Sequence, residues 1–463
     1  MKKEHIITIF ECILVFMMVY IFNTFFYNNY DHIIDFTHCY SIANNLIPYK
    51  DFNIVVGPVY PVLISIFLRI FGKNFIVFHI VNSSFIVGIY LLIKKYNKKT
   101  LAMLAIAFCT FALSAKYNLF TLLLFYIIYY TEKCNNKYKD YIIGILLSIL
   151  VFTKINVGFF LIIPTFILYF KKPMIILKRF ISFLIPSILI VLTIFLYGAL
   201  PGFINYTLLG LISFAKNTMI DFYIVFLVLA IIFLLKNIKK DKYLIYMLCY
   251  LMISYPLFES GHIAIGIFPT LVYMLDKLKQ KNITHIKNII TILSILFFIL
   301  FVFSNINSQK KIYNIKGFYE ITSIKKIDCN KKYCSQDIFI NGSFDVADKL
   351  NSYLKKESKE YRIFNFTYDA YFFKLIAREK IDKYDFIWNG NMGYKGEDTY
   401  IKEINNYCKT HKCMFIINKD DIYKRDKFSI INVKILKYVE KNYKEITKDR
   451  LSNKSYLSLY TND

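Results

Sequence analysis

Long apolar runs constrain this sequence more than any other feature. Residues 6–27, 75–93, 180–198 and 286–305 are almost wholly apolar, and each approaches or exceeds the ~20 residues that an α-helix needs to cross about 30 Å of hydrocarbon. Hydrophobic residues make up 56% of the chain, above the share of about 45–50% in soluble domains. The first run lacks a following small-residue cleavage site, so we expect a retained anchor and not a signal peptide.

The remaining apolar segments complete a polytopic α-helical membrane protein. With uncertain edges, the chain divides into about eleven transmembrane helices near residues 6–27, 75–93, 100–115, 118–131, 140–153, 155–170, 180–198, 221–235, 243–256, 263–275 and 287–305. Residues 58–71 are also apolar, but they contain two prolines and Arg69 and are too short to span. We predict a re-entrant or surface helix there, within a long first external loop at 28–74.

Lysine clusters orient these spans. Residues 94–99, 171–172 with 178–179, and 236–242 are short basic loops on one side of the scheme, which is the asymmetry of the positive-inside rule. The N-terminus is therefore predicted to be cytoplasmic and the C-terminus extracytoplasmic. The net charge is +26, but the lysines come in short clusters between apolar runs and not along one face of a soluble domain, so we expect no nucleic-acid partner.

The last third of the chain, residues 306–463, has a charged and mixed composition. Residues 361–369 and 384–388 read as strands, 402–410 as a helix and 413–417 as another strand. We therefore expect two domains, a transmembrane domain at 1–305 and a small soluble α/β domain at 306–463. Cys329, Cys334, Cys408 and Cys413 favour disulfides in an oxidising compartment, although a zinc site is the alternative.

Two acidic residues follow the first span. Asp31 and Asp35 are four residues apart, so a helix would place them on one face. Paired carboxylates at a membrane surface can act as a base and an orienting group for an attacking hydroxyl. The alternative interpretation is a solvated helix start, where acidic residues are common.

Further ionisable residues fall at the external edges of later spans. Lys154 and Asn156 lie where two spans meet, and Glu259 and His262 follow a Tyr-Pro pair. Charges at such depth are functional candidates, and a lysine could hold a lipid-linked phosphate. Alternatively, Lys154 snorkels to the interface, and His262 bonds a carbonyl at a helix end.

At these residues the chain resembles polytopic glycosyltransferases of the GT-C class, in the broad group of protein O-mannosyltransferases and the enzymes that add aminoarabinose to lipid A. The resemblance covers about residues 1–305. It rests on the acidic residue after the first span, on Pro48-Tyr49-Lys50-Asp51-Phe52 with Gly57-Pro58, on Thr153 to Gly158, and on Tyr255-Pro256 with His262. Asn45, Leu257 and Glu259 stand where the family usually has Gly, Arg and Asp.

The resemblance implies that residues 1–305 form a catalytic domain. This domain would transfer a sugar from a polyprenyl-phosphate donor at the external face of a bacterial plasma membrane. The acceptor would be a glycan, lipid or protein. Asp31 would be the catalytic carboxylate, with Asp35 as its competitor, and the donor contacts would be Tyr49, Asp51, Lys154, Asn156, Glu259 and His262. No cofactor is expected, and a divalent metal ion stays open. A transporter of lipid-linked glycans and a non-catalytic receptor or assembly protein are the alternative functions.

Overall fold

The computed structural model describes most of the N-terminal part of the chain and a smaller share of the C-terminal part. The described residues are 2–25, 30–96, 115–215, 219–220, 222–258, 260–280, 360–367, 370–371, 380–385, 392–418, 433–446 and 457–463. The span expected at 287–305 lies outside these residues, as do Cys329 and Cys334. The span expected at 100–115 also lies outside them, except for its last residue.

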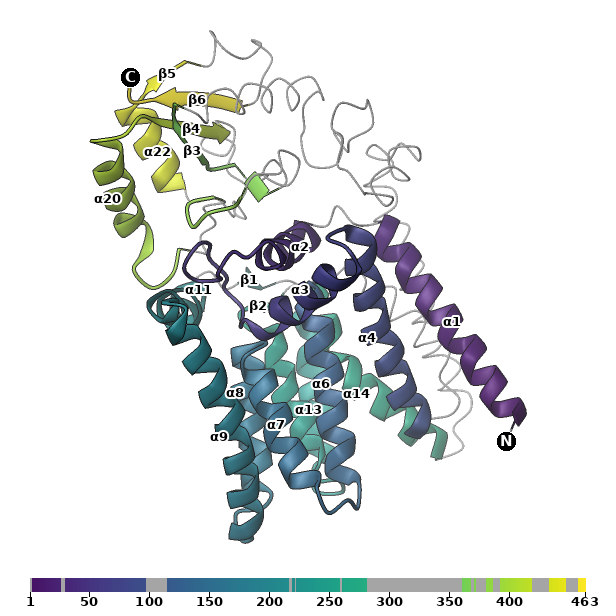
Figure 1. The fold of residues 1–463 in the computed structure, drawn as a ribbon. Helices are drawn as coiled ribbons and strands as arrows, with labels where there is room; N and C mark the ends of the chain where they lie inside the picture. The colour runs from purple at the N-terminus through teal and green to yellow at the C-terminus, as the bar shows by residue number, and fades with distance from the viewer. Residues whose placement is uncertain are drawn as a thin grey trace.

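A bundle of helices forms the N-terminal part (Figure 1). Each span that we expected within the described residues is matched by a helix. For the span at 243–256 this helix is α13 together with the 3₁₀ turn η2 that follows it. These helices are α1 (Lys2–Phe25), α4 (Phe75–Tyr96), α6 (Lys116–Lys133), α7 (Lys139–Val151), α8 (Ile155–Ile167), α9 (Pro173–Leu196), α12 (Ile224–Asn237), α13 (Leu244–Tyr250) with η2 (Leu251–Ser254), and α14 (Ser260–Gln280).

Three of these helices, α1, α4 and α9, are long and apolar enough to cross a membrane. The outward surface of α9 is apolar, with Ile188 and Leu189 53% and 58% exposed. Exposed apolar side chains in such continuity are typical of a surface covered by lipid. The described chain is therefore mostly α-helical, with three helices that are candidates for crossing a membrane.

Two short helices lie across one end of the bundle. Figure 1 shows α2 (Tyr30–Ala43) and α3 (Val59–Phe71) between the long helices and the C-terminal sheet. The helix expected at 58–71 is thus present, and its 13 residues extend only about 20 Å, less than the hydrocarbon thickness. The loop between α2 and α3 packs on α10 (Leu200–Phe203), which leads into the π-turn η1 (Ile204–Leu208) and α11 (Gly210–Ala215).

Lysine-rich turns meet at the opposite end of the bundle. Lys133 Nζ lies 3.4 Å from Asp241 Oδ2, and Lys242 Nζ lies 5.8 Å from the ring centre of Tyr169. These contacts bring together the turns between α6 and α7, between α8 and α9, and between α12 and α13. The basic loops therefore cluster at one end, as a common cytoplasmic side requires.

Arg179 corrects one part of the loop assignment. We expected Arg179 in a basic loop with Lys178, but α9 already begins at Pro173 and Arg179 is buried within the bundle. Its guanidinium donates to Asp140 Oδ1 at 2.8 Å and to the Thr165 carbonyl at 3.0 Å, and lies 2.9 Å from Glu132 Oε2. The apolar run in the sequence starts at residue 180, whereas α9 starts at Pro173. The two starts differ because the first two turns of the helix include Arg179 with its buried polar contacts.

The C-terminal part contains a small mixed sheet in the order β3-β4-β6-β5. Strand β3 (Arg362–Asn365) runs parallel to β4 (Cys413–Asn418), while β6 (Leu457–Thr461) pairs antiparallel with β4 and with β5 (Lys444–Glu445). Helices α20 (Gly396–Cys408) and α22 (Val433–Asn442) contribute buried apolar residues to its core. The predicted small α/β layer is present.

Two details of the α/β prediction have different outcomes. A disulfide joins Cys408 at the end of α20 to Cys413 at the start of β4; a disulfide was expected among the four cysteines, and the structure gives the pairing that the spacing left open for these two. The strand expected at 384–388 is wrong where it can be judged, because Tyr384 and Asp385 lie in a turn and the other three residues are outside the described residues. Asp382 Oδ1 accepts the Tyr384 N–H at 2.7 Å, and such an Asx contact favours a turn over a strand.

The predicted orientation can be tested by labelling residues at the two ends of the bundle from outside the cell. Lys137 is exposed in the lysine-rich turn between α6 and α7, and Lys402 is exposed on α20. In intact cells, a membrane-impermeant maleimide should label a Lys402→Cys variant, and it should label Lys137→Cys only after permeabilisation. The wild-type protein gives the background of native thiols, and labelling of both variants in intact cells would contradict the orientation.

A stability prediction follows from Arg179. Replacing one partner of a buried ion pair leaves an uncompensated charge and costs about 3–5 kcal/mol. Arg179→Met should therefore lower the melting temperature of the detergent-solubilised protein sharply, because Glu132 and Asp140 would lose their cation. Lys178→Met, at the less buried neighbouring position, should change it little, and equal melting temperatures for both variants would refute a structural role for this cluster.

Candidate functional site

The acidic helix α2 carries the two carboxylates that follow the first span. Asp31 lies in its first turn and Asp35 one turn later, so the side chains share one face. Asp31 is partly buried, whereas Asp35 is only 4% exposed. The two positions thus differ in environment, and Asp31 is the one with access to solvent.

Asp35 is held by the N-terminus of α6. Its Oδ2 accepts the backbone N–H of Lys116 at 2.5 Å, and the N–H of Tyr117 also favours the ionised carboxylate. The first N–H groups of a helix have no partner within that helix, so they suit an anion. Burial nevertheless raises the pKa of Asp35 to about 8, and the charge of Asp31 acts in the same direction.

Lys154 approaches the same helix terminus from another direction. It precedes α8, and its Nζ donates to Asn118 Oδ1 at 2.7 Å and to the Ile253 carbonyl at 3.2 Å. The ammonium also lies 5.4 Å from the ring centre of Tyr117. Residues 116–118 therefore connect Asp35 with Lys154. These two residues are more than a hundred positions apart in the sequence.

Asn156 fixes the segment that leads to His262. Its Nδ2 donates to the carbonyls of Met252 and Tyr255 at 3.0 and 2.9 Å, next to the cis bond before Pro256. Ser254 Oγ donates in turn to the His262 carbonyl at 3.1 Å. The late Tyr-Pro element is thus tied to the corner that holds Lys154, while Glu259 lies outside the described residues.

The Gly57-Pro58 element packs directly on this corner. The N–H groups of Gly57 and Val59 donate to the carbonyls of Thr153 and Phe152 at 3.2 and 3.1 Å. A Cβ on Gly57 would lie only 1.9 Å from the Phe152 oxygen, so no other residue fits this approach. The loop before α3 is therefore fastened to the residues immediately preceding Lys154.

Tyr49 and Asp51 have structural contacts within their own loop. Asp51 Oδ2 accepts the Ile47 N–H at 2.7 Å, and the Tyr49 hydroxyl donates to the Val56 carbonyl at 2.8 Å. Tyr49 is buried and its ring packs edge-on against Phe203. Both side chains shape the turn, so the contacts in this structure give them a structural role beside the donor contact that we expected.

Two central residues of this site, Lys116 and Asn118, were not among those singled out from the sequence. Lys116 and Asn118 connect the acidic helix with Lys154, and Lys116 Nζ donates to Asn23 Oδ1 of α1 at 2.7 Å. A signal for Lys116 was present, since it is a lone lysine between two apolar segments on the predicted external side. Asn118 carried no such signal, because a single amide near a helix start has many structural explanations.

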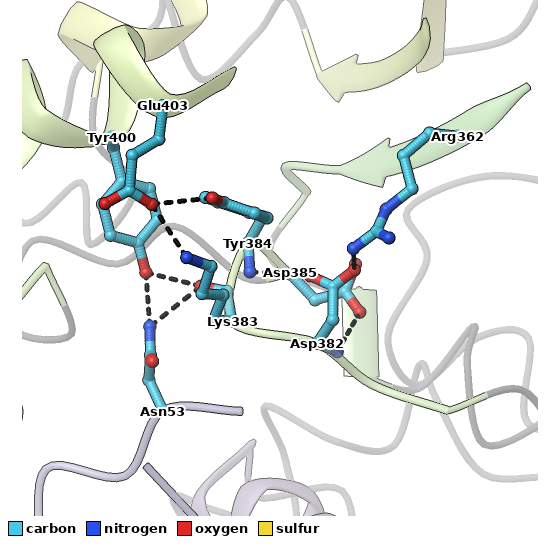
Figure 2. Close-up of polar contacts among 8 residues, drawn as sticks. All are labelled: Asn53, Arg362, Asp382, Lys383, Tyr384, Asp385, Tyr400 and Glu403. Atoms are coloured by element: carbon cyan, nitrogen blue, oxygen red, sulfur yellow. Dashed lines mark hydrogen bonds and ion pairs between the residues drawn. The ribbon is translucent and has the colours of Figure 1, made fainter. Parts of the chain in front are cut away.

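The α/β domain docks at the same end of the bundle. In Figure 2, Asn53 of the loop before α3 reaches the C-terminal domain, where its Nδ2 donates to the Lys383 carbonyl at 2.8 Å and to the Tyr400 hydroxyl. Asn205 of η1 makes a second contact, accepting the N–H groups of Tyr394 and Lys395 at 2.9 and 3.1 Å. The ring of Tyr371 lies 5.6 Å from that of His38 on α2.

Two ion pairs lie beside the docking contact. Glu403 accepts from Lys383 Nζ at 2.8 Å and from the Tyr384 hydroxyl at 2.7 Å, while Arg362 pairs with Asp382 (Figure 2). These pairs fix the turn that presents the Lys383 carbonyl to Asn53. The C-terminal domain is thus oriented against the loop between α2 and α3.

Comparison with known proteins gives no further assignment, because no family model, no curated protein and no solved structure matches this chain.

Proposed function

We propose that this chain is a membrane glycosyltransferase similar to the GT-C class. It would transfer a sugar from a polyprenyl-phosphate donor to a glycan, lipid or protein acceptor at the external face of a plasma membrane. One observation carries the proposal: four elements from three distant parts of the sequence meet at one end of the bundle, joined directly or through residues 116–118 of α6. They are the acidic helix α2, the Gly57-Pro58 loop, the Lys154 corner and the Tyr255-Pro256 segment.

The arrangement of charge supports an external site. Carboxylates and Lys154 lie at the end that carries the α/β domain with its disulfide, whereas the lysine-rich turns lie at the other end. A disulfide favours an oxidising compartment, and lysine-rich loops favour the cytoplasm. The proposed topology of about eleven spans, with the N-terminus inside, accounts for both observations.

In the proposed reaction the acceptor hydroxyl displaces the lipid phosphate in one step. Its oxygen forms a bond to the anomeric carbon as the bond from that carbon to the phosphate oxygen breaks. Asp31 accepts the hydroxyl proton, and the configuration at the anomeric carbon inverts. Asp31 suits this role better than Asp35, because it is partly exposed and a base must reach the hydroxyl.

Lys154 would stabilise the departing polyprenyl phosphate. A fixed cation near a developing negative charge lowers the barrier because it needs no reorganisation during the reaction. The contacts of Lys154 with Asn118 and Ile253 hold it in place. Asn156 acts through the backbone that it bonds, and His262 lies at the end of that segment. The membrane bundle suits a donor with a long isoprenoid chain.

The backbone conformation of Asn45 explains how asparagine can stand where the family usually has glycine. Asn45 has φ 67°, in the left-handed region that glycine and asparagine adopt most readily. Asn45 can therefore replace the usual glycine without changing the turn before Pro48. Leu257 cannot replace the positive charge of the arginine that the family usually has at this position. Fewer cations are then available for the donor phosphate, so Lys154 would contribute more to its stabilisation.

Substitution of the two aspartates tests the proposal. Asp31→Asn should lower the rate of sugar transfer from polyprenyl-phosphate donors in membranes by about 10²–10⁴-fold, the usual contribution of a general base. Asp35→Asn should lower the rate less, because it retains an acceptor oxygen for the Lys116 N–H. Asp398→Asn alters an exposed acid of the α/β domain and should leave the rate unchanged.

Lys154→Gln should also lower the rate, and Lys154→Arg should restore part of it, because arginine keeps the positive charge. Unchanged transfer in Asp31→Asn would remove the proposed mechanism. Absence of transfer by the wild type with every donor, together with movement of a labelled lipid-linked glycan across the bilayer, would favour the transporter alternative. Absence of both would favour a receptor or assembly protein.

A further inference from the structure

The acidic helix α2 is enclosed by the protein, although much of it is polar. It contains two carboxylates and two histidines, yet none of its residues from 31 to 43 is exposed. On the bundle side, the ring of Phe36 stacks on that of Phe75 of α4 at 3.8 Å, and Asp35 accepts the backbone N–H of Lys116. The side of α2 towards the C-terminal sheet is covered by different residues (Figure 1).

The α/β domain contacts the face of α2 that carries the carboxylates. His38 lies seven residues after Asp31, and positions i, i+4 and i+7 share one face of a helix. The ring of His38 packs on Phe52 of the following loop and on Tyr371 of the α/β domain, with both ring centres 5.6 Å away. His38 is therefore only 7% exposed, and the domain supports the acidic helix about one turn beyond Asp35.

A second contact joins the α/β domain to the π-turn η1 with a close fit. The carbonyl and Oδ1 of Asn205 accept the consecutive N–H groups of Tyr394 and Lys395. Gly393, immediately before them, has φ 69°, and a Cβ there would lie 2.5 Å from Asn205 Nδ2 and 2.9 Å from Tyr206 Cδ1. A side chain at position 393 would therefore push the two surfaces apart.

The loop between α2 and α3 connects these two contacts. Asn53 Nδ2 donates to the Lys383 carbonyl of the α/β domain at 2.8 Å. The carbonyl of the next residue, Ile54, accepts from Thr207 Oγ1 of η1 at 2.9 Å. The loop thus touches the domain, η1 and the helix that precedes it, so loss of docking should also loosen the His38 end of α2.

We infer that the docked α/β domain is a positioning element, which holds the acidic helix in the orientation that lets Asp31 accept the proton of the acceptor hydroxyl. This inference rests on the proposed function, because it specifies what keeps the base of that reaction in place. The domain acts through α2 and not on the reacting atoms. Such support matters because a displacement of about 1 Å at a reacting group can lower the rate about 10²-fold.

Two glycines of the α/β domain provide a matched pair of variants. Gly393→Val inserts a side chain into the contact with η1. Gly396→Val imposes the same backbone strain, since its φ is 68°, but its added Cβ meets no heavy atom of the described residues within 4 Å. Only Gly393→Val should therefore break docking. Hydrogen exchange of the full-length protein in detergent measures docking through the N–H groups of Tyr394 and Lys395, which lose their acceptors on Asn205.

Exchange in α2 tests the inference without requiring enzymatic activity. In Gly393→Val the amides of residues 33–43 should lose protection, whereas the amides of α20 should keep theirs because the domain itself stays folded. The kcat for sugar transfer should fall about 10²-fold, as for a misplaced base. The KM for the lipid donor should not change, because Lys154 keeps its contacts. Gly396→Val should match the wild type in all three measurements.

A variant on the bundle side guards against misfolding of the domain. If Gly393→Val also removes protection from α20, Asn205→Leu replaces it, because leucine removes the side-chain acceptor of the Lys395 N–H. Asn205→Asp retains an acceptor oxygen and should restore both α2 protection and kcat. Unchanged α2 protection, or an unchanged kcat, after docking is lost overturns the inference. Loss of α2 protection in a protein whose wild type transfers no sugar supports the positioning of α2 and refutes only the proposed function.

Discussion

The hydrogen bond between the N-terminus of α6 and the Asp35 carboxylate is the interaction on which the rest of the site depends. Lys116, Tyr117 and Asn118 occupy one helical turn, and together they contact the acidic helix on one side and Lys154 on the other. A helix terminus provides unpaired donors in a fixed direction. The turn thereby sets the separation between Asp35 of the acidic helix and the candidate cation Lys154.

Polar contacts of a different kind stabilise the opposite end of the bundle. Arg179 there satisfies Glu132 and Asp140 inside the helices, whereas the lysines of the turns stay close to solvent and to aromatic rings. Buried charges need partners in a medium of low polarity, and this cluster has them. The structural ion cluster of Arg179 is therefore separate from the acidic pair, in which Asp35 accepts a backbone N–H of α6.

The α/β domain extends the site beyond the membrane. Asn53 and Asn205 belong to loops that the bundle holds in place, and each bonds backbone groups of the domain. Contacts with backbone groups depend on the shape of the turn more than on the identity of its side chains. The Asx contacts of Asp382 with Tyr384, and of Asp385 with Asp382, therefore matter for docking because they define that turn.

The sequence by itself determined the helical class, the positions of the long apolar helices in the described residues, the short helix before residue 72 and the small α/β layer. These features follow from apolar length, charge between runs and local periodicity, which are properties of neighbouring residues. Asp35 and Lys154 could also be singled out, because ionisable groups are conspicuous in an apolar context. Only the tertiary structure decided that Arg179 is buried, that residues 384–385 form a turn, and that Lys116 and Asn118 connect the two candidates. Those outcomes depend on contacts between residues far apart in the chain, which no local pattern specifies.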